Sequence, residues 1–263
     1  MVKGIILDLD GTIYLGDELV PGAKDTLKLL RENGYRVVFL SNKALQKRST
    51  YVKKLNDLGI LTNEDDVVNS SYVMAHHLSQ TSPGANVYVI GERPLIEELR
   101  SAGLRISENP SEIDYVVASF DRDFHYDKLQ IAYDAIMRGA NFIATNPDRT
   151  CPVNGGEVPD AAGMIGAIEG VTGKKVEKIA GKPSRLMVDA ALDRLNLSKN
   201  ECLLVGDRLE TDIKMGNENG IQTALVLSGV TSREDVASSD IKPDFIFEDI
   251  SQLPGKLVIK SKK

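Results

Sequence analysis

The stretch that decides the fold reads Gly4-Ile5-Ile6-Leu7-Asp8-Leu9-Asp10-Gly11-Thr12. Its first four residues form a short apolar run, typical of a strand that is buried on both faces of a sheet. Asp8 and Asp10 follow directly, and because side chains alternate along a strand, the two carboxylates begin on the same side. Gly11 then permits a tight turn. Ligands gather outside the carboxyl ends of parallel strands, so the stretch points to a site at that edge of a sheet.

Taken alone, the pair of aspartates has two interpretations. Two carboxylates this close repel each other, and a bound divalent cation is the usual way in which proteins offset that repulsion. An ordinary surface turn rich in Asp and Gly would read the same way. The choice between a metal site and a turn depends on the rest of the chain.

Short β-rich runs alternate with amphipathic stretches along the whole chain. Residues 23, 26, 27 and 30 have the spacing of one helix face, and Gly34 ends that helix. Further strands are expected at residues 35–40, 87–90, 115–118, 141–145, 202–205, 223–227 and 244–247, and further helices before residue 59 and at 94–102, 128–138 and 188–195. This alternation predicts the α/β class, with a doubly wound, Rossmann-like parallel sheet that has helices on both faces.

Composition and charge narrow the class of protein. Of the 263 residues, 42% are hydrophobic and 27% charged, as in soluble globular proteins. A net charge of -6 argues against a nucleic-acid partner, because phosphate backbones select basic surfaces. No apolar run approaches the roughly 18 residues of a membrane span, and the apolar start does not resemble a signal peptide, so we expect a cytoplasmic protein without a membrane partner. Cys151 and Cys202 are expected to be reduced thiols, and Lys260–Lys263 a solvated end.

Three more polar motifs stand at strand ends or helix starts. Ser41-Asn42 follows the second expected strand, and Gly181-Lys182-Pro183-Ser184 places a lysine before a helix. Gly206-Asp207-Arg208-Leu209-Glu210-Thr211-Asp212 adds two carboxylates after another buried strand. Each motif alone has an ordinary interpretation, as a turn, an N-cap or a first-turn acid. Four motifs in this order favour one shared site.

Together the four motifs resemble the haloacid dehalogenase-like (HAD) superfamily, whose pattern is DxDx[TV], then Ser or Thr, then Lys, then GDxxxD-type acids. Residues 144–148 and 160–168 are similar to segments of its NagD or 4-nitrophenylphosphatase-like branch. Ser41 and Lys182 are 141 positions apart, which in this superfamily indicates an inserted cap domain. The expected domains are a catalytic core of residues 1–78 and 179–263 and an inserted α/β cap of residues 79–178.

The resemblance implies a catalytic role for five residues. Asp8 would be the nucleophile that becomes phosphorylated. Asp10 would be the general acid and then the general base, and Thr12 would hold it in place. Ser41 would bind a phosphoryl oxygen, and Lys182 would offset the charge of Asp8 and of the transferring group.

The implied cofactor is Mg²⁺, which prefers oxygen ligands. Its predicted ligands are Asp8, Asp10 through the main-chain carbonyl, and Asp207. Asp212 is expected to orient a ligand or Lys182 rather than to touch the metal. The remaining predicted site residues would bind substrate: Gly11, Asn42, Asn146 and Asp148.

The implied function is that of a phosphoric monoester hydrolase acting on small phosphorylated metabolites. Sugar phosphates, phosphoglycolate and glycerol phosphate are the expected substrate classes, with 4-nitrophenyl phosphate as an artificial substrate. Dehalogenases of the superfamily use one aspartate and no magnesium, and the branch-type cap favours hydrolysis over a phosphomutase. A catalytically silent or phospho-acceptor binding protein on the same fold is the alternative from another class. The sequence leaves the natural substrate, the roles of the cysteines and a homo-oligomeric state open.

Overall fold

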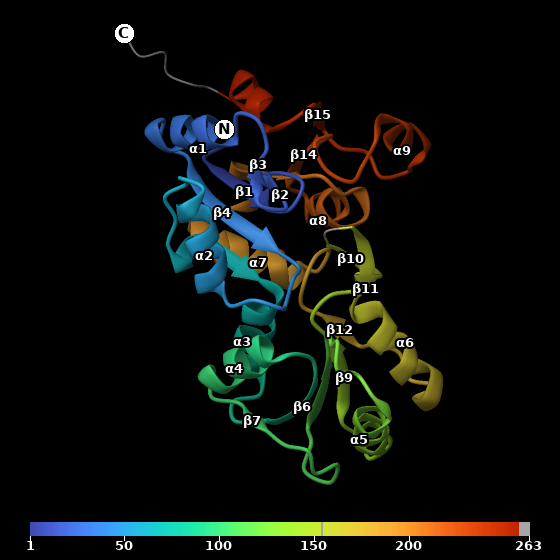
Figure 1. Ribbon diagram of the computed structural model, residues 1–263. Helices are drawn as coiled ribbons and strands as arrows, with labels where there is room; N and C mark the ends of the chain where they lie inside the picture. The colour runs from blue at the N-terminus through green and yellow to red at the C-terminus, as the bar shows by residue number, and fades with distance from the viewer. Residues whose placement is uncertain (154, 258–263) are drawn as a thin grey trace. The chain divides into compact units, whose positions relative to one another are not determined.

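The computed structural model of the chain describes residues 1–153 and 155–257 (Figure 1). The basic end at residues 260–263 lies outside this part. The chain divides into two compact units: a core unit made of Met1–Ser41, Arg48–Val68 and Met187–Lys263, and an inserted unit made of Asn42–Lys47 and Asn69–Leu186. Each unit has its own sheet of parallel strands with flanking helices, so the predicted α/β class is confirmed.

The six-stranded sheet has strand β1 near its centre. Its order is β15 (Phe245–Phe247), β14 (Gln222–Val226), β13 (Cys202–Gly206), β1 (Gly4–Asp8), β4 (Arg36–Ser41) and β5 (Val67–Asn69). β1 pairs in parallel with β13 and β4, so that Ile6 lies beside Leu204 and Val38. The whole of β1 is buried, as its apolar run predicts for a strand covered on both faces.

Helices of the core unit pack on this sheet. They are α1 (Ala23–Glu32), α2 (Arg48–Asp57), α7 (Arg185–Leu195), α8 (Lys214–Asn219) and α9 (Arg233–Ser238). Ile5 and Leu7 share a hydrophobic cluster with Leu27 of α1 and Tyr51 of α2. Because successive side chains of a strand point to opposite faces, Ile6 is directed to the other face. A short hairpin of β2 (Tyr14–Leu15) and β3 (Glu18–Leu19) follows β1.

The five-stranded sheet belongs to the inserted unit. Its order is β12 (Lys178–Ile179), β9 (Asn141–Ala144), β8 (Tyr115–Ala118), β6 (Asn86–Ile90) and β7 (Arg105–Ile106). Helices α5 (Tyr126–Met137) and α6 (Ala161–Thr172) cover one face through a shared cluster with β6, β8 and β9. Helices α3 (Ser70–Thr81) and α4 (Arg93–Ser101) contact each other and lie at the other face (Figure 1). An antiparallel hairpin of β10 (Thr150–Val153) and β11 (Gly156–Pro159) precedes α6.

The predicted elements agree closely with the structure, whereas several elements of the structure are absent from the predictions. Among them are two of the longest helices, α3 and α6, together with β5, β7, α9 and the two hairpins. The predicted domain boundaries, after residues 78 and 178, fall at α3 and β12, and the compact units divide near residues 69 and 187, so the exact boundaries stay a prediction.

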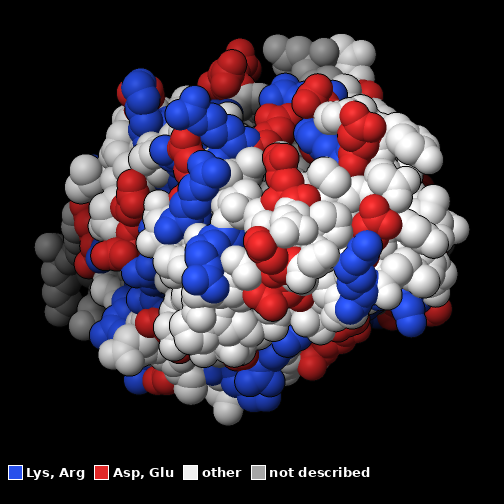
Figure 2. Space-filling model, turned by 90° about the horizontal axis from the view of Figure 1, so that it is seen from below, with Lys and Arg blue, Asp and Glu red and all other residues white. Residues whose placement is uncertain are grey.

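The face drawn in Figure 2 carries basic and acidic side chains that are interspersed rather than gathered by sign. Within the described ranges, none of the helices combines the length and apolar character that crossing a membrane requires.

Candidate active site

Asp8 is the last residue of β1, at the carboxyl end of the core sheet. The chain turns sharply after it, because the carbonyl of Leu9 accepts hydrogen bonds from the amides of Thr12, Ile13 and Tyr14. Gly11 lies in this turn with a φ of 90°, in the left-handed region that favours glycine. The turn leaves the carboxylate of Asp8 buried and Asp10 half-buried.

Asp207 follows β13, the strand that pairs with β1. Its carboxylate oxygen Oδ2 accepts a hydrogen bond of 2.7 Å from the amide of Val230, and its carbonyl accepts one of 3.3 Å from the amide of Thr231. Gly229 makes this contact possible, because a Cβ there would lie 2.0 Å from Asp207 Oδ2. The loop after β14 therefore fixes the position of the Asp207 carboxylate.

Asp212 lies in a π-helical segment, Leu209–Ile213, that leads into α8. Its Oδ2 accepts a hydrogen bond of 3.2 Å from the amide of Arg208. The side chain packs on Gly206, where a Cβ would lie 2.3 Å from Asp212 Cγ. Single π-turns are frequent at functional sites, where they redirect a side chain.

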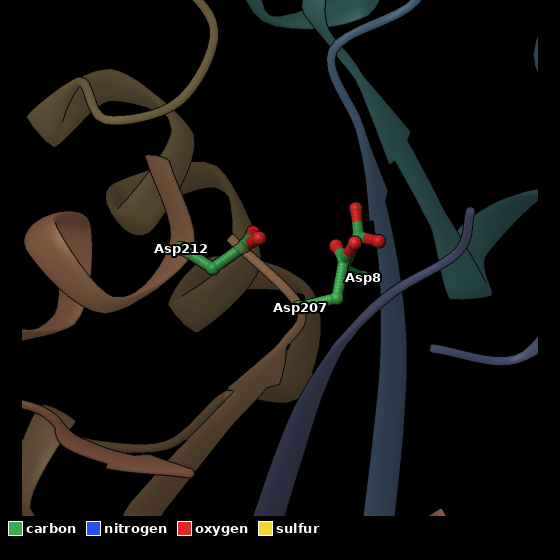
Figure 3. Close-up of side chains that lie close together, drawn as sticks. All are labelled: Asp8, Asp207 and Asp212. Carbon is green, nitrogen blue, oxygen red and sulfur yellow. The ribbon is translucent and has the colours of Figure 1, made fainter. Parts of the chain in front are cut away.

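These three carboxylates form one buried group. Asp8, Asp207 and Asp212 are exposed by only 8%, 1% and 1%, and each offers one oxygen within 4.8 Å of the others. Figure 3 shows Asp212 directed towards Asp8 and Asp207. Buried like charges at this separation favour a cation between them, and carboxylate oxygens are the ligands that Mg²⁺ prefers. The chemistry of the group therefore fits a hard divalent cation.

The group contains two of the predicted metal ligands, Asp8 and Asp207, together with Asp212. Asp10 is predicted to bind the metal through its main-chain carbonyl, so that role and the predicted orienting role of Asp212 stay predictions. Asp212 enters the group because the π-helical segment turns its side chain back towards the sheet, and residue spacing does not indicate such a turn.

Three further buried side chains of the core unit, Tyr14, Ser41 and Thr12, carry hydroxyl groups. Burial raises the pKa of Tyr14 far above its ordinary value, and the negative charges of Asp10 and Asp8 raise that pKa further, so the phenol stays protonated. Ser41 ends β4, and its hydroxyl donates a hydrogen bond of 3.3 Å to the phenol oxygen of Tyr51. The hydroxyl of Thr12 is fully buried and has no hydrogen-bond partner among the residues described, so its predicted role of holding Asp10 stays a prediction.

The other predicted site residues lie in the inserted unit, where they form one hydrogen-bond network. Asp148 Oδ2 accepts bonds from the side-chain amides of Asn42, at 3.0 Å, and Asn146, at 2.9 Å. Asn146 Nδ2 also donates to Asp160 Oδ1 at 3.1 Å. Burial raises the pKa of Asp160, while the bonds from the Ala161 amide and Asn146 oppose that rise. The network continues from Asn42 to the main chain of the buried residue Lys182.

Some residues of the site are absent from the sequence predictions. Tyr14 and Tyr51 stand where the sequence pattern expects apolar residues, so nothing in the sequence marks them as residues of the site. Ser228, Gly229 and Val230 do have a sequence signal, because a polar and small-residue segment follows the strand expected at 223–227. The same strand-end argument that identifies Asp8 and Asp207 applies to this segment. Ser228 Oγ donates a hydrogen bond of 2.7 Å to the carbonyl of Gly11, which ties the two loops together.

Replacing Gly229 by alanine tests whether the Asp207 carboxylate helps to bind a divalent cation. The φ of Gly229 is outside the left-handed region, so the backbone tolerates alanine, but the new Cβ would displace the carboxylate. We expect Gly229→Ala to weaken Mg²⁺ binding by about 10–100-fold, the range found when groups that position metal ligands are lost. Isothermal titration calorimetry measures this. Gly255→Ala is the control, because its Cβ meets nothing within 4 Å. Equal Mg²⁺ affinity in both variants would contradict the assignment.

Comparison with known proteins places this site in a family. The profile of haloacid dehalogenase-like hydrolases matches residues 5–105, and a second HAD-hydrolase-like profile matches residues 179–253. The chain is 42% identical to the sugar-phosphatase AraL of Bacillus subtilis over 250 residues, which covers 95% of this chain and 91% of that protein.

Two solved structures show the same similarity across nearly the whole chain. The p-nitrophenyl phosphatase from Archaeoglobus fulgidus has a TM-score of 0.92 and 34% identity, covering 97% of this chain and 99% of that one. NagD from Escherichia coli has a TM-score of 0.88 and 31% identity, covering 95% and 98%. With the four motifs in place, the chain belongs to the haloacid dehalogenase-like hydrolase family, as a phosphatase of its NagD and 4-nitrophenylphosphatase-like branch.

Proposed function

We propose that the protein is a Mg²⁺-dependent phosphatase that hydrolyses phosphate monoesters of small metabolites through a phosphoryl group carried on Asp8. The observation that supports this most directly is the buried group of Asp8, Asp207 and Asp212 at the carboxyl end of the core sheet. Asp8 is the member of that group at the end of the central strand, where the family motif has its nucleophile.

The carboxylates of Asp8, Asp207 and Asp212 would hold the cation, with the main-chain carbonyl of Asp10 as a further ligand implied by the motif. A Mg²⁺ ion bound there would neutralise the negative charge of the phosphate monoester, which otherwise repels nucleophiles. The amide of Val230, which donates to Asp207 Oδ2, would keep that ligand oriented.

The proposed reaction has two steps. In the first, a carboxylate oxygen of Asp8 forms a bond to phosphorus, and the bond from phosphorus to the ester oxygen breaks. Asp10, as a carboxylic acid, gives its proton to the departing oxygen. In the second, the Asp10 carboxylate takes a proton from water while that water attacks phosphorus. The bond to Asp8 then breaks, and inorganic phosphate leaves.

The other residues of the motifs have supporting roles in this proposal. Ser41 would bind a phosphoryl oxygen through its hydroxyl, and Tyr51, its hydrogen-bond partner, would orient that hydroxyl. Lys182 would offset negative charge on Asp8 and on the transferred group. Thr12 would hold Asp10. The residues proposed to bind substrate are Gly11, Asn42, Asn146 and Asp148.

Sugar phosphates are the first substrate class to test, because the relative AraL is named a sugar-phosphatase. Phosphoglycolate and glycerol phosphate are the next, and 4-nitrophenyl phosphate is the artificial probe. A catalytically silent protein on the same fold is disfavoured because all the motif residues are present, and a phospho-acceptor switch is disfavoured because Asp10 stands where such proteins lack an acid and base.

The domain assignment, a core of residues 1–78 and 179–263 with a cap of 79–178, is also a proposal. We expect limited proteolysis to cut near the ends of the inserted segment, because boundaries between domains are preferred sites of cleavage. Mg²⁺ together with fluoroberyllate, a phosphate analogue, should suppress these cuts. Mass spectrometry of the fragments identifies the sites. First cuts in the middle of the β6 or β8 strands would contradict a separately folded cap.

Replacing Asp8 and Asp10 separately tests the division of labour between them. Asp8→Asn should eliminate turnover, because an amide is a poor nucleophile. In Asp10→Asn the attacking carboxylate is still present, and nitrophenolate departs with little need of a proton. Loss of the general base should slow the second step by about 10²–10⁴-fold. We therefore expect Asp10→Asn to release a burst of about one nitrophenolate per enzyme in stopped-flow measurements.

Acid-quenched Asp10→Asn should then carry a hydroxylamine-sensitive phosphoryl group, and peptide mapping should locate it on Asp8. Unmodified enzyme serves as the control, because it should hold much less of the label. A label on another residue, or ordinary turnover in Asp10→Asn, would refute the assignment of the two carboxylates.

A further inference from the structure

The side-chain amide of Asn42 forms hydrogen bonds with both the main-chain amide and the main-chain carbonyl of Lys182. The amide of Lys182 donates to Asn42 Oδ1 at 2.7 Å, and Asn42 Nδ2 donates to the carbonyl of Lys182 at 3.1 Å. From this geometry we infer that Asn42 is a positioning residue for Lys182, and that Asp148 holds the Asn42 amide in place. The inference rests on the proposed function, in which the positive charge of Lys182 offsets negative charge on Asp8 and on the transferred group.

An asparagine suits this contact because its side chain offers both a donor and an acceptor. The orientation of the Asn42 amide is fixed by its neighbours. Its second Nδ2 hydrogen is directed to Asp148 Oδ2, at 3.0 Å. If the amide were reversed, Oδ1 would face both the carboxylate of Asp148 and the carbonyl of Lys182, which are acceptors.

Further hydrogen bonds hold Asn42 and Asp148 in place. The main-chain carbonyl of Asn42 accepts a hydrogen bond of 2.6 Å from Ser70 Oγ, at the start of α3. Asp148 Oδ2 accepts a second bond from Asn146, whose own Oδ1 accepts one of 2.8 Å from Thr145 Oγ1. Hydrogen bonds in a chain of this kind restrict each other's geometry.

The surroundings of Gly181 show how closely the Asn42 side chain approaches the main chain before Lys182. A Cβ at this position would lie 2.6 Å from Asn42 Oδ1 and 2.7 Å from the carbonyl oxygen of Thr145. The amide of Gly181 also donates to that carbonyl at 2.7 Å. Glycine therefore precedes the lysine because the Asn42 amide occupies the space that a side chain would need.

The hydrogen bonds of Asn42 favour a positioning role over the substrate-binding role predicted for this residue. Both hydrogens of its side-chain amide are used inside the network, one for the Lys182 carbonyl and one for Asp148. An Asn42 that positions Lys182 acts on every substrate alike, and its loss changes kcat. An Asn42 that contacts the substrate affects KM, and differently from one substrate to another.

The test compares Asn42→Ala, Asn42→Asp, Asp148→Asn and the exchange Asn42→Asp/Asp148→Asn on 4-nitrophenyl phosphate and glycerol phosphate. Asn42→Ala should lower kcat by about 10–100-fold on both substrates with little change in KM, the range typical of groups that orient a functional residue. Asn42→Asp should be as impaired, because two carboxylates then face each other. In the exchange, residue 42 can again accept from the Lys182 amide and residue 148 can donate to residue 42, but no donor faces the Lys182 carbonyl, so part of the kcat lost in Asn42→Asp should return.

Asn109→Ala is the matched control, since Asn109 is exposed in the inserted unit and, among the residues described, its side chain accepts only a local bond from the Ser111 amide. Circular dichroism checks that each variant folds, and the exchange variant keeps the test decisive if Asn42→Ala does not. Unchanged kcat in Asn42→Ala, a change in KM alone, unequal losses on the two substrates, or an exchange variant no faster than Asn42→Asp would overturn the inference. Unmodified enzyme without activity on either ester would instead refute the proposed function.

Discussion

Mutual repulsion of three buried carboxylates is the constraint around which the core unit is organised. Asp8, Asp207 and Asp212 each bring an oxygen within 4.8 Å of the others, and none is exposed by more than 8%. Buried charges are costly unless an opposite charge or hydrogen bonds compensate them. A divalent cation would supply that charge, and the main-chain amides of Val230 and Arg208 supply part of the hydrogen bonding.

The parallel sheet accounts for how residues far apart in sequence reach this arrangement. β1 and β13 are neighbours, so Asp8, which ends β1, and Asp207, which follows β13, meet at one edge. Small residues then allow the close approach, since a side chain on Gly11, Gly206 or Gly229 would collide with one of the acids. The loop after β14 belongs to the site for the same reason. Its Val230 amide donates to the Asp207 carboxylate, and Ser228 joins the loop to the turn after Asp8.

Much of the core sheet and of the carboxylate group could be predicted from sequence, because both depend on the spacing of apolar residues and on the position of acids at strand ends. The apolar run at 4–7 indicates a buried strand, and carboxylates directly after it indicate a strand-end site. The place of Asp212 could not be predicted, since it depends on a π-helical turn that residue spacing does not encode. The hydrogen bonds between Asn42 and Lys182 could not be predicted either. They join residues 140 positions apart, through a side chain whose orientation is known only from the structure.

The most direct test of the account is the effect of Mg²⁺ on thermal unfolding, compared between the unmodified protein and Asp207→Asn. A ligand at about 100 times its Kd stabilises the folded state by about 2.7 kcal/mol, which for a chain of this size raises the unfolding midpoint by about 5–10 °C. The account predicts such a rise for the unmodified protein and a much smaller one for Asp207→Asn. An unmodified protein that unfolds at the same temperature with and without Mg²⁺, or an equal rise in both proteins, would contradict it.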